Sequence, residues 1–163
     1  AWPNALAELA LAKAELARWS GDTAQARHQL EVATTEMGDD AQRANVQAVV
    51  RDLLGYLAED VGEAREHRAA AFDAATETGH PLTISQVLVG LADLALRTGQ
   101  DEQAARLLGA SAGVRGLPDR SHPDVARIEE TTRSRLGDVG FTEATRAGSE
   151  ASWPELAAVT LAS

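Results

Sequence analysis

The chain has 163 residues, of which 33 are alanine and 4% are aromatic. Because alanine has the highest helix propensity, this composition favours an all-helical fold over a β-sandwich. The formal net charge is −10 and no cluster of basic residues accompanies it, which disfavours contact with nucleic acid or with an anionic membrane surface. The absence of cysteine excludes disulfides and thiolate metal sites. No apolar run approaches the roughly 18 residues that a membrane span needs.

The first helix pair is expected over residues 4–38. Its first helix should end near Trp19, with a buried side formed by Leu6, Leu9, Leu16 and Ala17. A capping box at Asp22 and Gln25 predicts the start of the second helix. Apolar residues then recur at helical spacing at Ala26, Leu30, Ala33 and Met37. Gly38-Asp39-Asp40 is expected to end this helix.

Two further helix pairs are expected over residues 41–79 and 82–113. Asp60 and Glu63 repeat the capping box, and Gly79-His80-Pro81 ends the second pair. The apolar stripes of the second pair contain Val46, Val50, Leu53, Leu57, Ala64, Ala71, Phe72 and Ala75. Those of the third contain Ile84, Val87, Leu88, Leu91, Leu94, Ala95, Ala104, Leu107, Leu108 and Ser111. The Gly- and Pro-rich stretch 113–123 is expected to be a boundary or an irregular connection.

Residues 121–163 depart from this pattern and are expected to form a helical cap over the open end of the array. The expected elements are a helix capped by Ser121, a loop bracketed by Gly137 and Gly140, a short helix from Phe141 to Gly148, and a last helix begun by the capping box Ser152–Glu155.

Three segments, 21–26, 59–64 and 99–104, repeat one pattern, and their closing alanines lie 38 and 40 residues apart. Such a period is typical of stacked helix pairs. In this register the pairs resemble divergent tetratricopeptide (TPR) units, through Ala17, Gly55 and Ala95, then Gly21, Glu59 and Gly99, then Ala26, Ala64 and Ala104. The resemblance implies a right-handed array of three antiparallel helix pairs with a C-terminal cap, in a single domain over residues 1–163. The middle unit has Arg68 where the others have Leu30 and Leu108.

The stretch 104–162 is similar to the C-terminal end of large multidomain bacterial transcriptional regulators, the antibiotic-regulator (AfsR-like) and large LuxR-type proteins. The similarity lies in Ala104–Ala110, in Arg135-Leu136-Gly137 with the following Phe141 and Ala144, and in Glu155–Ala158. In these regulators TPR-like helices follow an ATPase domain, and a DNA-binding domain lies elsewhere in the chain. The start at Ala1-Trp2-Pro3-Asn4 has neither a methionine nor a basic region, and it is expected to be a cut within a longer protein.

This resemblance implies a non-catalytic regulatory domain of a cytoplasmic transcriptional regulator. Its partners would be another protein, an effector or other domains of the same polypeptide, bound through a concave helical surface. A self-association scaffold, working as a homodimer without ligand sensing, is the alternative.

Three candidate chemistries are set aside. Gly109-Ala110-Ser111-Ala112-Gly113 matches the G-x-S-x-G motif, which needs a strained strand-to-helix turn; Ser111 instead occupies the small inward position of a helix. His28 with Glu31, and Glu63 with His67, are spaced like paired ligands, but a zinc site needs three or four. The chain also lacks the glycine motifs that bind phosphates. No enzymatic activity, metal or cofactor is therefore expected.

The candidate partner-binding residues are the positions expected to be exposed on the first helix of each pair, which lines the concave surface of a TPR array. They are Glu15, Arg18, Trp19, Tyr56, Gln86, Asp93 and Arg97. Trp, Tyr and Arg often anchor interfaces; in the alternative interpretation Trp19 and Tyr56 fill gaps between helices. The mixture suits an extended peptide or a partner helix, and the acidic first half favours a partner that carries Lys or Arg. No direct contact with nucleic acid or membrane is expected.

Overall fold

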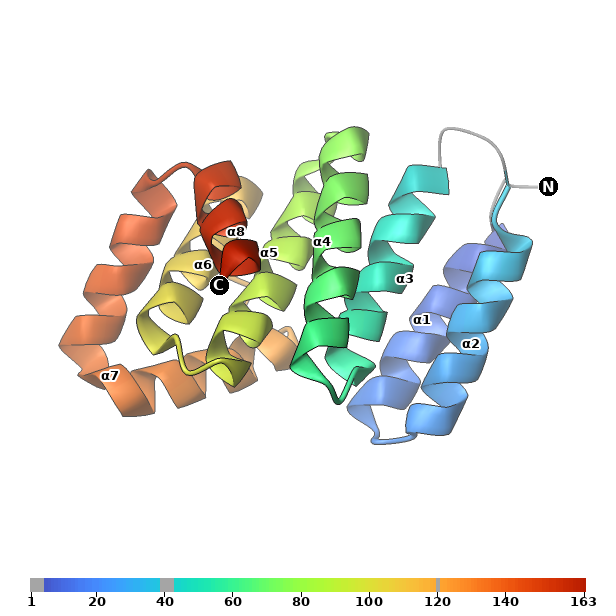
Figure 1. The fold of residues 1–163 in the computed structure, drawn as a ribbon, viewed down its shortest axis with the longest axis horizontal. Helices are drawn as coiled ribbons and strands as arrows, with labels where there is room; N and C mark the ends of the chain where they lie inside the picture. The colour runs from blue at the N-terminus through green and yellow to red at the C-terminus, as the bar shows by residue number, and fades with distance from the viewer. Residues whose placement is uncertain (1–4, 39–42, 120) are drawn as a thin grey trace. The chain divides into compact units, whose positions relative to one another are not determined.

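The computed structural model describes residues 5–38, 43–119 and 121–163, and the regular structure in this part of the chain is entirely helical. The helices are α1 (Ala5–Trp19), α2 (Thr23–Glu36), α3 (Arg43–Leu57), α4 (Val61–Thr78), α5 (Pro81–Arg97), α6 (Asp101–Arg115), α7 (Pro123–Glu150) and α8 (Trp153–Ala162). The all-helical fold expected from the composition is confirmed. The chain forms two compact units, one ending at Gly79 and the other beginning at His80 (Figure 1). Asp39 and Asp40, in the expected break after α2, lie outside the described residues.

The first unit contains two antiparallel helix pairs, α1 with α2 and α3 with α4 (Figure 1). Small side chains let the helices of a pair approach closely, while a few branched residues fill the space between them. One apolar cluster joins α1, α2 and α3 through Ala7, Ala10, Leu11, Ala14, Leu30, Ala33, Val46, Val50 and Leu53.

The structure confirms the helix starts that were predicted from capping boxes. In each case the side-chain oxygen of the first residue accepts a hydrogen bond from the backbone N–H three residues on. The pairs are Asp22–Gln25 (3.1 Å), Asp60–Glu63 (2.9 Å) and Ser152–Glu155 (3.4 Å). These bonds satisfy N–H groups that have no partner within the helix.

The predicted buried face of α1 is wrong. Leu6, Leu9 and Leu16 are 62%, 52% and 64% exposed. The buried residues are instead Ala7, Ala10, Leu11, Ala14 and Ala17. Both sets follow helical spacing, and the alanine set turns inward because it allows the closer approach to α2 and α3. Ala17 alone belongs to both sets.

The second unit is built around α5 and α6, which pack antiparallel, with α7 and α8 against them (Figure 1). Gly137 has φ 78° and ψ 163° and divides α7 into two arms, residues 123–136 and 138–150. This conformation is nearly exclusive to glycine. The predicted loop between Gly137 and Gly140 is wrong, because the break is confined to Gly137 and the helix after it runs to Glu150, beyond the predicted end at Gly148. The side-chain amide of Gln103 fixes α8 by donating to the Leu156 carbonyl (3.2 Å) and the Thr160 hydroxyl (3.1 Å).

The start of α7 differs from the prediction. Ser121 does not cap the helix, which begins at Pro123 with His122 as its N-cap residue. The Ser121 hydroxyl instead donates to Oδ1 of Asp119, at 2.7 Å. Proline at the first position needs no N–H partner, so the helix begins without a side-chain cap.

Helix α6 and the second arm of α7 come close enough for their backbones to touch. A Cβ atom added at Gly109 would overlap the carbonyl oxygen of Thr145, and one added at Gly148 would overlap the carbonyl oxygen of Arg106. Glycine is required at both positions because any side chain would separate the helices. The first glycine of the G-x-S-x-G match is thus explained by helix packing.

Candidate functional site

The second unit contains a cavity of about 270 Å³ between α5, α6, residues 117–119 and 122 of the following connection, and both arms of α7. Ligand cavities typically measure roughly 300–1,000 Å³, so this one is near the small end of that range. The described residues that line it are Ser85, Gln86, Val89, Leu108, Gly109, Ser111, Ala112, Arg115, Leu117, Pro118, Asp119, His122, Val125, Glu129, Arg133, Phe141, Thr142 and Thr145.

One part of the cavity wall is apolar. Val89 comes from α5, Leu108 from α6, Val125 from the first arm of α7 and Phe141 from the second arm. The kink at Gly137 is what allows the two arms to face the same space. Three helices therefore line the cavity, and α7 lines it on both sides of its kink.

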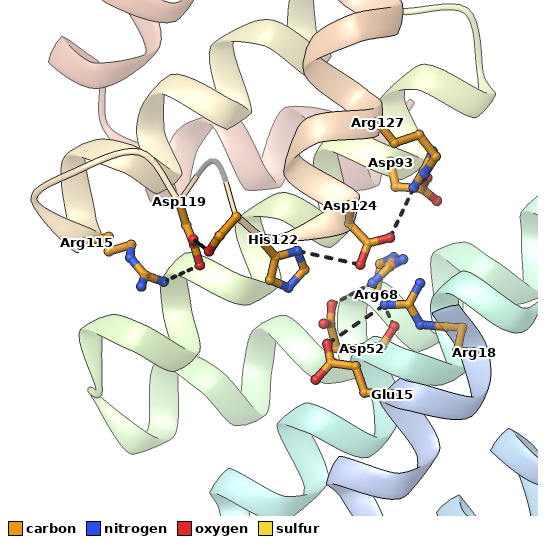
Figure 2. A network of polar contacts seen from close by, with 11 residues as sticks. Glu15, Arg18, Asp52, Arg68, Asp93, Arg115, Asp119, His122, Asp124 and Arg127 are labelled. Atoms are coloured by element: carbon orange, nitrogen blue, oxygen red, sulfur yellow. Dashed lines mark hydrogen bonds and ion pairs between the residues drawn. The ribbon is translucent and has the colours of Figure 1, made fainter. Parts of the chain in front are cut away.

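A first ion pair lies at the end of α6. Arg115 approaches Asp119, four residues further along the chain, at 3.2 Å (Figure 2). The pKa of Asp119 is lowered, first by the hydrogen bond from the Ser121 hydroxyl, and further by the positive charge of Arg115 and the proximity of His122. The carboxylate stays ionised at neutral pH, and the pair adds no net charge to the cavity.

A second ion pair lies on α7. The guanidinium of Arg133 contacts Glu129 at 2.9 Å and Asp138 at 3.1 Å. These two hydrogen bonds raise the pKa of Arg133. The guanidinium also lies over the ring of Phe141, with Cζ 4.3 Å from the centroid. Arg133 thus links the two arms of α7 across Gly137.

The hydroxyls of Ser85 and Ser111 face each other on the cavity wall. Ser111 donates to the Ser85 carbonyl at 2.8 Å, and Ser85 Oγ lies 3.1 Å from the Ser111 carbonyl and 2.8 Å from Ser111 Oγ. Both side chains are buried, at 3% and 5% exposure. The Ser111 hydrogen is engaged with a backbone carbonyl inside a regular helix, which supports the packing interpretation of this residue over that of a nucleophile.

A polar network beside the cavity anchors the start of α7. Arg127 contacts Asp93 of α5 at 2.7 Å and Asp124 at 3.5 Å, and His122 Nδ1 lies 3.7 Å from Asp124 (Figure 2). Asp93 and Asp124 are 5% and 3% exposed. Asp93 was expected to be exposed for a partner; it is instead a buried link between α5 and α7.

In the first unit, the predicted residues gather around Tyr56. The guanidinium groups of Arg18 and Arg68 each lie over its ring, with Cζ 4.1 Å from the centroid. Arg18 also contacts Glu15 at 3.9 Å and lies 5.7 Å from the Trp19 ring. Four of the seven predicted partner-binding residues therefore lie together in one cluster.

Arg68 occupies the interior of the α3–α4 pair, with no exposed surface. It donates to the carboxylate of Asp52 at 2.6 Å and to the Asp52 carbonyl at 2.8 Å (Figure 2). A Cβ atom at Gly55 would lie 2.7 Å from the guanidinium. The small residue at this repeat position therefore makes room for an arginine.

A more open groove of about 350 Å³ runs between α2 and α3, over Leu30, Val50 and Leu54. Arg27 at its edge donates to the Leu57 carbonyl at 3.2 Å. Glu63 and His67, set aside above as a metal pair, do meet at 3.6 Å, but the other ring nitrogen of His67 faces the Arg51 guanidinium at 3.2 Å. A cation at this position disfavours a bound metal.

Of the predicted partner-binding residues in the second unit, only Gln86 lines the cavity. Arg97 is half-buried in the last turn of α5. Sequence reasoning missed Arg115, Asp119, Arg133 and Phe141, because only folding brings α6 and the arms of α7 together. The irregular stretch 113–123 was the one available signal, and it does supply part of the cavity wall.

No protein-family model, curated protein or solved structure matches this chain. In the part of the chain that the structure describes, none of the helices combines the length and apolar character needed to cross a bilayer.

Proposed function

We propose that this chain is a non-catalytic regulatory domain that binds an effector or a segment of a protein partner in the cavity of its second unit. The observation that carries the proposal is the cavity itself, which combines an apolar wall with paired charges contributed by α6 and α7. Concave sites of this composition are the usual places for small ligands.

The wider context that we propose is a cytoplasmic transcriptional regulator in which TPR-like helix pairs follow an ATPase domain. Its support is the resemblance of residues 104–162 to such proteins, together with the repeated helix pairs. A ligand that contacts both arms of α7 favours one angle at Gly137 over others. Such differential binding is what a regulatory switch requires.

Cavity filling tests the binding function. In Ala112→Phe, the new ring would occupy the cavity, whereas Ala126→Phe places the same ring on an exposed position of α7 outside it. Because a ligand stabilises the folded state that binds it, a thermal-shift screen of small effectors and short peptides should find hits shared by the wild type and Ala126→Phe but lost in Ala112→Phe. Ala112→Leu serves if the larger ring prevents folding. The proposal would be contradicted if the compounds still stabilised Ala112→Phe, or if no compound stabilised the wild type.

The regulator context has its own test in the gene upstream of the Ala1 codon. A nucleotide-binding domain with a P-loop in the same reading frame is the expected finding. A secretory signal peptide there would overturn the assignment, while leaving the cavity proposal to stand on its own measurement.

Self-association is a second candidate function, and the exposed face of α1 favours it. Leu6, Leu9 and Leu16 form an apolar strip at the surface of the first unit, and such patches often mark interfaces. Light scattering over a concentration series should detect a dimer that Leu9→Glu dissociates. Val139→Glu, at a residue that is 75% exposed in the second unit, is the matched control. A wild-type chain that stays monomeric at high concentration would eliminate this candidate.

A further inference from the structure

We propose that the cavity of the second unit takes an uncharged ligand, namely one aromatic or branched apolar group with an adjacent amide. This inference rests on the proposed function and specifies the chemical class of the ligand. It follows from three properties of the cavity: its charges, its size and its remaining hydrogen-bonding groups.

The charges of the cavity are already paired within the protein. Arg115 is held by Asp119, and Arg133 by Glu129 and Asp138. The two guanidinium groups and the two carboxylates among the lining residues cancel. A charged ligand would lose part of its hydration on entering the cavity, and the counter-charges there are already engaged in these pairs. An uncharged ligand does not have this cost.

The size of the cavity and its apolar wall define the body of the ligand. A volume of about 270 Å³ is near the small end of the range of ligand cavities. Val89, Leu108, Val125 and Phe141 offer this space a surface of carbon atoms. One ring or branched side chain with a short substituent fits it, and burying that group provides most of the binding free energy.

Two neutral lining groups are available for hydrogen bonds. The carboxamide of Gln86 and the hydroxyl of Thr142 make no side-chain hydrogen bond to other described residues, and both side chains are exposed at the cavity. The Ser111 hydroxyl directs its hydrogen to a backbone carbonyl, so it offers the ligand only an oxygen lone pair. An amide group matches Gln86 because each can donate and accept one hydrogen bond with the other.

Two sources can supply this chemistry. One is a phenylalanine or leucine residue inside a partner peptide, whose backbone provides the amide. The other is a small aryl amide that binds as a free effector. In a partner peptide the backbone continues on both sides of the group in the cavity, whereas a free effector ends there.

The test is an ¹⁵N-resolved NMR titration of the 163-residue chain with two matched probes. N-acetyl-L-phenylalaninamide is neutral, whereas N-acetyl-L-phenylalanine differs only by its carboxylate. The neutral probe should shift the amide resonances of cavity residues such as Val89 and Thr142, and the acid should bind at least tenfold more weakly. Equal or tighter binding of the acid in the cavity overturns the inference but leaves the proposed function intact. If neither probe binds in the cavity, the inference fails, and the thermal-shift screen alone decides the function.

Gln86→Met removes the carboxamide while keeping the length of the side chain. It should weaken the binding of the neutral probe by roughly two- to tenfold, which corresponds to the loss of one hydrogen bond. The thermal midpoint should not change. Gln47→Met, at an exposed glutamine of α3, is the matched control. It should change neither the binding of the neutral probe nor the thermal midpoint. Unaltered binding to Gln86→Met would contradict the amide contact.

A terminally blocked Gly-Gly-Phe-Gly-Gly peptide separates the two sources of the ligand. If the peptide binds more tightly than N-acetyl-L-phenylalaninamide, the source is a partner peptide. If it binds more weakly, the source is a free effector.

Discussion

Two helix pairs, α3–α4 of the first unit and α5–α6 of the second, use the same repeat position in different ways. Four residues after the closing alanines of the repeated segments, the chain has Leu30, Arg68 and Leu108. In the first unit Arg68 fills the interior of its helix pair, paired with Asp52 in space left by Gly55. In the second unit Leu108 forms part of the wall of a cavity. The comparison teaches that a charged residue can fill this position inside one helix pair, whereas in another pair a leucine at the same position borders a cavity.

The largest effect is expected from a substitution that disrupts the buried ion pair between α3 and α4. Asp52→Ala removes the carboxylate that Arg68 contacts and leaves a buried guanidinium without this counter-charge. Unfolding followed in urea should show a loss of about 3–5 kcal/mol, as for other broken buried ion pairs. The double variant Asp52→Ala/Arg68→Leu, which installs the leucine of the other two repeats, should recover most of this loss. A cost below about 1 kcal/mol for Asp52→Ala would show that the pair does not hold this interior together.

The second prediction concerns the wall of the open unit. In Gly109→Ala the new methyl group meets the Thr145 carbonyl, so α6 and the second arm of α7 must separate. The expected cost is about 2–3 kcal/mol, in the range for overpacking. Gly113→Ala lies one turn further along α6, where the nearest atom would be the Ser149 carbonyl oxygen at 3.5 Å, an ordinary contact. This control should be neutral or slightly stabilising in the same urea experiment. Equal effects of the two substitutions would argue against the close crossing.

The third prediction concerns the hinge of α7. Gly137→Ala forces a side chain into a backbone conformation that essentially only glycine adopts. We expect a loss of about 1–3 kcal/mol by thermal unfolding, together with weaker binding of the neutral probe, because Val125 and Phe141 would no longer face the same space. Gly140→Ala, whose Cβ atom would only touch the Leu136 side chain at 3.4 Å, should retain both properties. Wild-type binding by Gly137→Ala would mean that the angle between the arms does not shape the cavity.

The smallest expected effect is electrostatic. Ser121→Ala removes the main cause of the lowered pKa of Asp119, so this pKa should rise toward its ordinary value near 4. Because the pKa is lowered in the folded state, Asp119 contributes stability above about pH 4, and this contribution is lost as the pH falls through the folded value. Carboxyl ¹³C resonances followed by NMR from pH 2 to 6 would measure the change. An unchanged midpoint for Asp119 would contradict the assigned hydrogen bond.

Local signals in the sequence were sufficient for much of the fold. The capping boxes placed the starts of α2, α4 and α8. Gly137 was expected at one edge of a loop, and the structure confines the break in α7 to this residue. The face of α1 was wrong because two overlapping apolar stripes share the same helical period, and periodicity cannot rank them. The choice depends on how closely α1 approaches its neighbours, which is a property of the packed unit.

The candidate site was much less predictable. Gln86 was expected at a binding surface, and it lines the cavity. Asp93 was expected to be exposed, but its carboxylate is buried against Arg127 from a helix that begins thirty residues later. Cavity residues such as Arg133 and Phe141 meet only after α7 bends at Gly137. No local pattern encodes such contacts between distant segments.

The central claim is that the open interior of the second unit, and not the first unit, holds the ligand. Intermolecular NOEs between the ring protons of N-acetyl-L-phenylalaninamide and the methyl groups of the ¹³C-labelled chain test it most directly. We expect NOEs to Val89, Leu108 and Val125, which line the cavity. NOEs confined to Leu30, Val50 and Leu54, in the groove between α2 and α3, would contradict it.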